Sequence, residues 1–80
     1  MRGGLRVLSG GDVVDILVGF GFSVIGGTKH IKLRRTGPAG NETLIVPDHS
    51  PIAKGTLRMI FSQASHYISQ DELRPHFYND

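Results

Sequence analysis

The sequence predicts an α+β fold in which one helix is followed by three antiparallel strands and a second helix. Two segments, one in each half of the chain, carry apolar residues at helical spacing, and a segment between them alternates strictly between polar and apolar residues. Two short segments on either side of the alternating one are rich in β-forming residues. A three-stranded antiparallel sheet with one apolar face needs covering, and two helices on that face would cover it.

Length and composition indicate one small globular domain. We expect a single domain over 1–80, with its core at about 8–68 and a C-terminal tail at 69–80. The chain has no cysteine, which excludes disulfides and thiolate ligands for zinc. No secretory signal is visible, and no apolar run approaches the ~18 residues that cross a membrane. We therefore expect a cytoplasmic protein without a membrane association.

The first helix is expected at about 10–20. Its apolar residues recur at positions i, i+3, i+4 and i+7, namely Val13, Ile16, Leu17 and Phe20. Ser9 precedes them and is a natural N-cap, because its hydroxyl can accept a hydrogen bond from a free amide of the first turn. Gly19 and Gly21 are expected to end the helix, since glycine adopts the left-handed conformation without a steric penalty.

The central strands carry the polar groups of interest. A short β-rich segment at 22–25 ends at Gly26 and Gly27, and the next segment, 29–35, alternates with period two. This alternation places the apolar residues Ile31 and Leu33 on one face of the sheet. The other face then presents three polar side chains together, which are His30, Lys32 and Arg34.

The second half of the chain predicts a hairpin partner and the covering helix. A loop at 36–41 leads to a third strand at 42–47, which Pro47 ends because proline cannot donate to a sheet. The last main helix, with Thr56 as a candidate cap, carries apolar residues at helical spacing: Leu57, Ile60, Phe61 and Ala64. Ser69 suits the start of a short helix that Pro75 limits, and Phe77 and Tyr78 are expected to pack back onto the body. This order of elements is that of double-stranded-RNA-binding-domain-like folds.

Charge is distributed unevenly along the chain. The net charge is only +2, yet the segment 29–35 holds two lysines, two arginines and a histidine without an acidic residue. A local basic stripe in a nearly neutral protein indicates an anionic ligand, of which nucleic acid is the most frequent. The alternative is a solvated strand whose lysines protect the edge of a sheet. Charge alone does not decide between these two interpretations.

Four segments, taken in order, resemble one family of small bacterial toxins. They are LSGGDVVDILVGFGF, GGTKHIKLRR, VPDH and KGTLRMIFSQA, and they fall within about 8–68. Each segment alone is weak, but four at matching spacing in so short a chain are fairly specific. On these residues the sequence resembles the HicA (YcfA-like) family of toxin–antitoxin systems.

The resemblance implies an mRNA interferase, an endoribonuclease that cleaves mRNA without a metal or other cofactor. It also implies a HicB-type antitoxin partner that covers the active site. The catalytic histidine of the family lies in a glycine–serine–histidine motif, frequently followed by a second histidine. Gly27 and Thr28 match the first two positions, Lys29 occupies the place of the first histidine, and His30 the place of the second. Either His30 has taken over catalysis, or the chain binds RNA and cuts it poorly.

The residue types near His30 suit metal-free RNA cleavage. Histidine can act as general acid or base on the 2′-hydroxyl and the phosphate because its pKa lies near working pH. Lysine and arginine can stabilise phosphate charge. We therefore assign catalysis to His30 and RNA binding to the residues Gly27, Thr28, Lys29, Lys32, Arg34 and Arg35.

His49 matches the histidine of the family's valine–proline–any–histidine segment. It could orient the following loop, contact the partner or carry a second proton, and the structural role is favoured. No metal site is expected, because the chain lacks His-x-x-x-His and clustered acids at ligand spacing. The competing functions are a non-catalytic RNA-binding module and an interaction subunit whose basic face docks an acidic partner.

Overall fold

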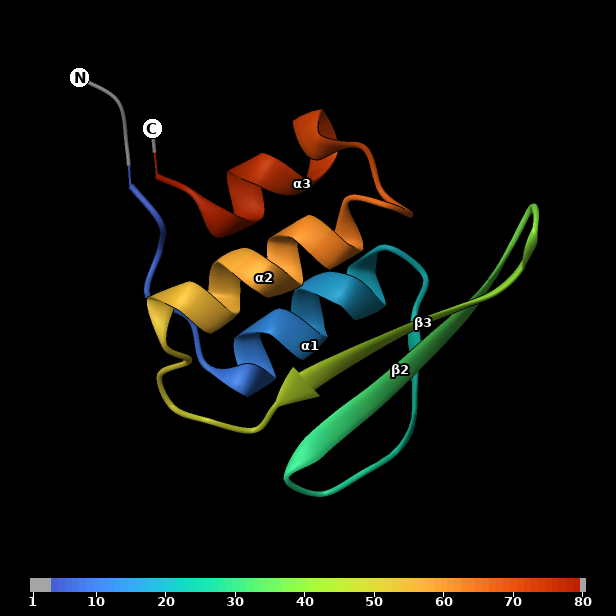
Figure 1. Cartoon of the computed structure of the whole chain (residues 1–80), viewed down its shortest axis with the longest axis horizontal. Coiled ribbons are helices and arrows are strands. Elements are labelled where there is room, and N and C mark those ends of the chain that lie inside the picture. The colour runs from blue at the N-terminus through green and yellow to red at the C-terminus, as the bar shows by residue number, and fades with distance from the viewer. Residues whose placement is uncertain (1–3, 80) are drawn as a thin grey trace.

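The computed structural model describes residues 4–79 and confirms the predicted α+β architecture. Helices cover one face of a three-stranded antiparallel sheet with strand order β1-β2-β3 (Figure 1). The elements in chain order are α1 (Gly10–Gly19), β1 (Ser23–Gly26), β2 (His30–Gly37), β3 (Gly40–Pro47), α2 (Lys54–Ala64) and α3 (Gln70–Phe77). The arrangement up to α2 is the expected double-stranded-RNA-binding-domain-like one.

Helix α1 begins at the predicted cap. The Ser9 Oγ accepts a hydrogen bond from the Asp12 backbone N–H at 3.0 Å, and Asp12 Oδ2 accepts one from the Ser9 N–H at 3.0 Å. The Ser9 backbone N–H is the main cause that lowers the pKa of Asp12, because it stabilises the charged carboxylate. Gly21, at φ +97°, follows the C-terminus of the helix, whereas Gly19 is its last helical residue.

The hairpin of β2 and β3 is longer than predicted. The expected loop 36–41 was wrong, because pairing continues to Gly37 opposite Gly40 and leaves only residues 38–39 as the turn. Gly40 adopts φ +122°, a conformation that glycine takes without strain and that lets so short a turn close. The added length extends the sheet beyond the helices (Figure 1).

Strand β1 is short and irregular. It covers Ser23–Gly26, one residue later than predicted, and its register against β2 shifts between Val24 and Gly26. Such a bulge places an extra residue in one strand only. Because the bulge lies in β1, the alternation of β2 is unaffected, and the predicted face of His30 is confirmed by its exposure.

Apolar residues from all three helices and the sheet form one core. Each of the buried positions predicted for the helix now called α2 is confirmed, and Phe77 of α3 is fully buried. Phe77 packs on Phe61 with ring centroids 5.5 Å apart, as does Tyr78 at 5.3 Å, so the tail packs onto the body as expected. The core consists of Leu8, Val13, Leu17, Phe22, Leu33, Leu44, Val46, Ile52, Leu57, Ile60, Phe61, Ala64, Ile68, Leu73 and Phe77.

Two details of the last helices differ from the sequence prediction. Thr56 does not cap α2, which begins earlier, at Lys54, after Ala53 without a side-chain cap. Pro75 does not limit α3 but lies inside it. Proline lacks an amide and so removes one backbone hydrogen bond of the helix. The turn that follows is held by the burial of Phe77. Ser69 caps α3 as predicted, accepting a hydrogen bond from the Glu72 N–H at 3.2 Å.

Candidate active site

His30 is the first residue of β2, and its side chain is exposed on the open face of the sheet. Thr28 and Lys29 lie directly before it in the β1–β2 connection and are also exposed. Gly27 shapes this connection. It adopts φ +92°, and a Cβ at this position would collide with the carbonyl oxygen of His30. Only glycine fits this position, so Gly27 sets the path of the backbone that places His30.

His49 lies in the loop between β3 and α2, and backbone hydrogen bonds hold that loop. The carbonyl oxygen of His49 accepts from the Gly10 N–H at 2.7 Å, and that of Lys29 accepts from the Asp48 N–H at 2.8 Å. A Cβ on Gly10 would collide with the carbonyl oxygen of Pro47, so the loop packs directly on the first turn of α1. The loop after β3 and the first turn of α1, which are distant in sequence, are thereby held next to each other.

Both predicted histidines line one surface pocket, which we call the histidine pocket. His30 contributes from β2 and His49 from the loop after β3, and the volume of the pocket is about 340 Å³. Two imidazoles facing one pocket can serve two proton transfers on a molecule bound between them. The remaining lining residues are Ile45, Pro47, Thr56, Met59, Ile60 and Gln63.

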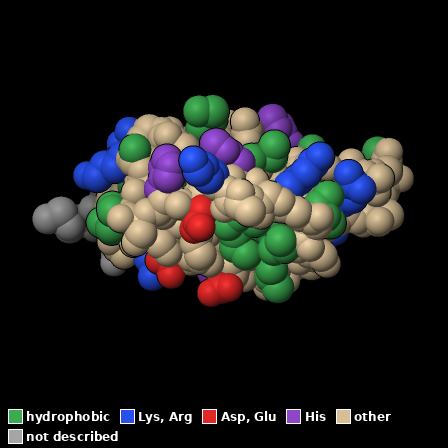
Figure 2. Space-filling view, turned by 90° about the horizontal axis from the view of Figure 1, so that it is seen from below, with side chains coloured by type: hydrophobic (Ala, Val, Ile, Leu, Met, Phe, Trp, Pro, Cys, Tyr) green, Lys and Arg blue, Asp and Glu red, His purple; other side chains and the backbone are tan. Residues whose placement is uncertain are grey.

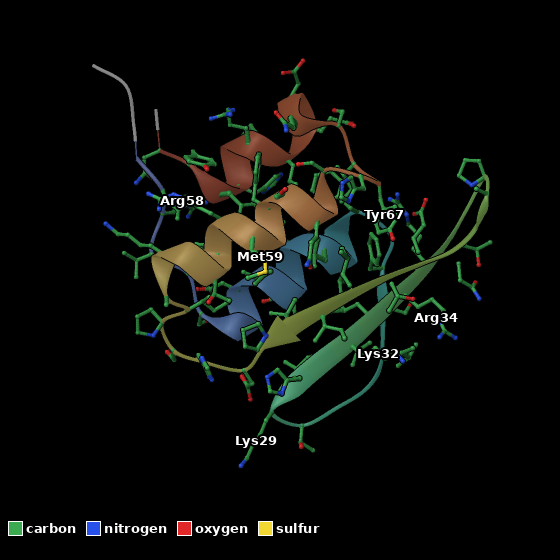
Figure 3. The ribbon with its side chains drawn as sticks, viewed as in Figure 1. Lys29, Lys32, Arg34, Arg58, Met59 and Tyr67 are labelled. Carbon is green, nitrogen blue, oxygen red and sulfur yellow. The ribbon has the colours of Figure 1, made fainter. Side chains whose placement is uncertain are left out.

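Basic side chains continue from His30 along the sheet. Lys32 and Arg34 are exposed on the same face as His30, as the alternation predicted. Figure 3 shows both side chains on β2, while Lys29 points away from the body of the molecule. In Figure 2, most of the basic and histidine side chains lie along the upper half of the view, and the acidic side chains lie below most of them. The histidine pocket thus adjoins a positively charged strand.

The Arg35 side chain lies apart from this basic surface, so the geometry gives no support to its predicted role in RNA binding. Its guanidinium donates to Glu42 Oε1 at 2.8 Å, to the carbonyl oxygen of Phe20 at 2.7 Å and to that of Tyr67 at 2.8 Å. It also stacks over the Phe22 ring, 4.8 Å from its centroid. Strand alternation turns Arg35 to the face opposite Arg34, and these contacts occupy its side chain there.

The sequence analysis missed the helical side of the histidine pocket. Thr56, Met59 and Gln63 of α2 line it, and their spacing of i, i+3 and i+7 places them on one face of the helix. This face lies beside the buried stripe that begins at Leu57 and faces the core. The helical spacing was visible in the sequence, but only the packing of α2 against β3 shows that this face borders His30.

Within residues 4–79, no group of three or more His, Cys, Asp or Glu side chains is placed to hold a metal ion. Across the same part of the chain, no helix is long and apolar enough to cross a membrane. Metal-independent cleavage stays a prediction, because only the reaction itself, and not the placement of these side chains, can show it.

The fold and the pocket define a small α+β protein of double-stranded-RNA-binding-domain-like arrangement with two histidines beside a basic strand. The family model described as the HicA toxin of bacterial toxin–antitoxin systems matches residues 10–65. The chain therefore belongs to the HicA toxin family, as its four sequence segments indicated. No curated protein and no solved structure shows significant similarity to it.

Proposed function

We propose that this HicA-family toxin is a metal-independent endoribonuclease that cleaves mRNA, with His30 as general acid or base. The observation that carries this proposal is the position of His30. It is exposed at the start of β2, in one pocket with His49 and on one face with Lys32 and Arg34. Proton transfer and phosphate binding are therefore available at adjacent points of one surface.

The reaction uses the nucleophile of the RNA itself. The 2′-oxygen forms a bond to the neighbouring phosphorus, and the bond from phosphorus to the 5′-oxygen breaks. A base removes the proton of the 2′-hydroxyl, and an acid delivers a proton to the departing 5′-oxygen. His30 carries one of these transfers, and His49, which lines the same pocket, is the candidate for the other. No metal or other cofactor enters the scheme.

The remaining assigned residues bind the RNA rather than react with it. Lys29, Lys32 and Arg34 neutralise phosphate charge, and the exposed Thr28 offers a hydroxyl next to His30. Gly27 acts through the backbone conformation that positions His30. Lys29, in the place of the motif histidine, points away from the body (Figure 3), so the proton chemistry is assigned to the next residue.

Membership of a toxin family implies an antitoxin partner. We assign this role to a HicB-type protein that covers the histidine pocket, because a cover there blocks both histidines at once. The whole chain, 1–80, acts as one domain, with the tail 69–80 attached through the buried Phe77. An mRNA substrate implies that the toxin acts in the cytoplasm.

The deciding experiment is RNA cleavage by the purified chain in the presence of a chelator. We expect wild type to cut and His30→Ala to bind RNA but cut about 10²- to 10⁴-fold more slowly. His76→Ala is the matched control, because His76 packs edge-on to Phe20 with centroids 5.4 Å apart and does not line the histidine pocket. Equal cutting by wild type and His30→Ala would remove His30 from the reaction and leave His49 as the next candidate.

A non-catalytic RNA-binding module is the second candidate function, and Lys29 in the place of the motif histidine favours it. It predicts RNA binding that weakens with salt and no cleavage by any variant. If the wild-type chain binds RNA without cutting it, this second function is the correct one.

A further inference from the structure

A second pocket, also of about 340 Å³, lies between β3 and the end of α2. Two residues, Ile45 of β3 and Gln63 of α2, line both this pocket and the histidine pocket. The two pockets therefore adjoin each other along the seam between strand β3 and helix α2, and we call them together the β3–α2 groove. It starts at His30 and His49 and ends at His66 and Tyr67.

The floor and walls of the β3–α2 groove combine apolar surface with an amide that is free to bond. Ile45 is 49% exposed, Met59 55% and Tyr67 37%, although each is a large apolar side chain. Within residues 4–79 the Gln63 amide makes no hydrogen bond to the protein. Exposed apolar surface beside an open donor and acceptor suits a nucleobase, whose faces stack and whose edges form hydrogen bonds.

The charge beside the groove has the sign that nucleic acid requires. Lys32 lies directly across from Ile45 in the sheet, and Arg34 lies directly across from Thr43, which lines the second pocket. Directly paired residues share a face, so both cations border the groove. Figure 3 shows Met59 on one side of β3 and both cations on the other. No described lining residue of either pocket carries a carboxylate.

The spacing of the polar groups on β2 fits a single strand laid along the groove. His30, Lys32 and Arg34 are successive same-face residues, about 6.6 Å apart in an extended strand. This repeat is comparable to the distance between neighbouring phosphates of an extended single-stranded RNA. A strand that places one phosphate at His30 can therefore place the next ones at Lys32 and Arg34, with its bases over the groove.

We propose that the β3–α2 groove binds the nucleotides that flank the scissile phosphate, with Gln63 reading the edge of one base and Tyr67 stacking on another. This assignment rests on the proposed ribonuclease function and adds the residues that select the cleavage site. The Tyr67 ring is held for stacking, because it contacts Phe22 at a centroid distance of 6.4 Å. The Gln63 side chain is exposed and belongs neither to the core nor to the proposed proton transfers.

The test compares Gln63→Ala with wild type on short single-stranded RNAs of random sequence, whose cut ends are sequenced. We expect the base preference at one position beside the cut to fall about tenfold, because a side-chain amide discriminates between base edges by that order. Gln70→Ala is the matched control, since Gln70 is exposed at the start of α3 and lines neither pocket. Unchanged base preference in Gln63→Ala would overturn the assignment.

Stacking is tested by RNA binding in a His30→Ala background, where no cutting interferes. Tyr67→Leu is expected to weaken binding about tenfold and Tyr67→Phe to retain it, because only the first removes the aromatic face. Arg35 binds the backbone oxygen of Tyr67, so both variants keep that hydrogen bond, and thermal unfolding checks the fold. Equal RNA binding by Tyr67→Leu and Tyr67→Phe would overturn the stacking role.

Two further outcomes separate this proposal from its alternatives. If wild type fails to cut with chelator present but RNA binding still depends on Gln63 and Tyr67, the ribonuclease function fails and with it the cleavage-site role of the groove, while the contacts of Gln63 and Tyr67 with RNA stand. If these variants keep RNA binding and base preference but lose binding of a HicB-type antitoxin, the groove is a protein-docking surface and the RNA assignment is wrong.

Discussion

Arg34 and Arg35 are neighbours in β2 with opposite surroundings. Arg34 is exposed on the open face of the sheet, which it shares with His30 and Lys32. Arg35 lies on the other face, where it donates to Glu42 and to the carbonyl oxygens of Phe20 and Tyr67. Two adjacent residues of one strand therefore differ: the Arg34 guanidinium is available to a ligand, whereas that of Arg35 is engaged in hydrogen bonds within the protein. A basic run in a sequence is therefore evidence for a ligand only after its residues are divided by face.

The largest effect on stability is expected from Arg35→Ala. It leaves Glu42, whose side chain is only 13% exposed, without its partner and removes donors from two carbonyl oxygens. We expect the free energy of unfolding to fall by about 3 kcal/mol, measured by urea denaturation. Arg34→Ala is the control and should change it by no more than about 0.5 kcal/mol. Equal effects of the two substitutions would contradict the division by face.

A smaller loss of stability with a large loss of cleavage is expected from Gly27→Ala. An alanine at φ +92° is strained and its Cβ collides with the His30 carbonyl oxygen, so the start of β2 must move. We expect a cost of about 2 kcal/mol and a cleavage rate reduced beyond what unfolding explains. Gly26→Ala is the matched control, because a Cβ there meets nothing within 4 Å. Cleavage by Gly27→Ala at the rate of Gly26→Ala would show that His30 does not depend on this backbone path.

Local sequence patterns predicted those parts of the molecule whose structure depends on residues close together in the sequence. The Ser9 cap, the alternation of β2 and the buried stripe of α2 were all visible in the sequence, because each involves residues only a few positions apart. The hairpin length was not, since it depends on Gly40 adopting a positive φ rather than on apolar spacing. The prediction that Pro75 limits the helix was wrong, since α3 continues past it to the buried Phe77.

The site shows the same division between local and distant contacts. The shared face of His30 and Lys32 follows from period two, so the sequence was sufficient for it. The contact of Arg35 with Tyr67 joins residues 32 positions apart, and no local pattern contains it. Gln63 likewise becomes part of a groove only when α2 packs beside β3.

The salt dependence of RNA binding gives a smaller, more specific test of Arg34. If Arg34 contacts one phosphate, Arg34→Ala should lower the slope of log affinity against log salt concentration by about 0.7 and weaken binding across all sequences. Arg58→Ala is the matched control, because the exposed Arg58 lies on the side of α2 away from the strands (Figure 3). An equal change of slope in both variants would indicate diffuse charge attraction instead of a phosphate contact at Arg34.

The smallest effect is expected at the cap of α1, which supports His49 from a distance. The Ser9 backbone N–H, followed by the Ser9 hydroxyl, lowers the pKa of Asp12 in the folded chain. A lowered folded pKa means that the carboxylate adds stability above its unfolded pKa of about 3.9 and loses this contribution as the pH falls through the folded value. Asp12→Asn should therefore flatten the acid side of the stability profile, measured by thermal unfolding below about pH 5.

The control for this cap is Asp15→Asn on the same helix, because Asp15 is exposed and accepts no side-chain hydrogen bond from residues 4–79. Asp15→Asn should lose as much stability as wild type does when the pH falls below about 5. The Gly10 N–H of the same first turn donates to the His49 carbonyl oxygen, so loosening the cap also loosens the loop that holds His49. If His49 carries a proton in the reaction, Asp12→Asn should slow cleavage slightly at neutral pH while RNA affinity is retained. A cleavage rate equal to that of Asp15→Asn would show that the placement of His49 does not depend on the cap.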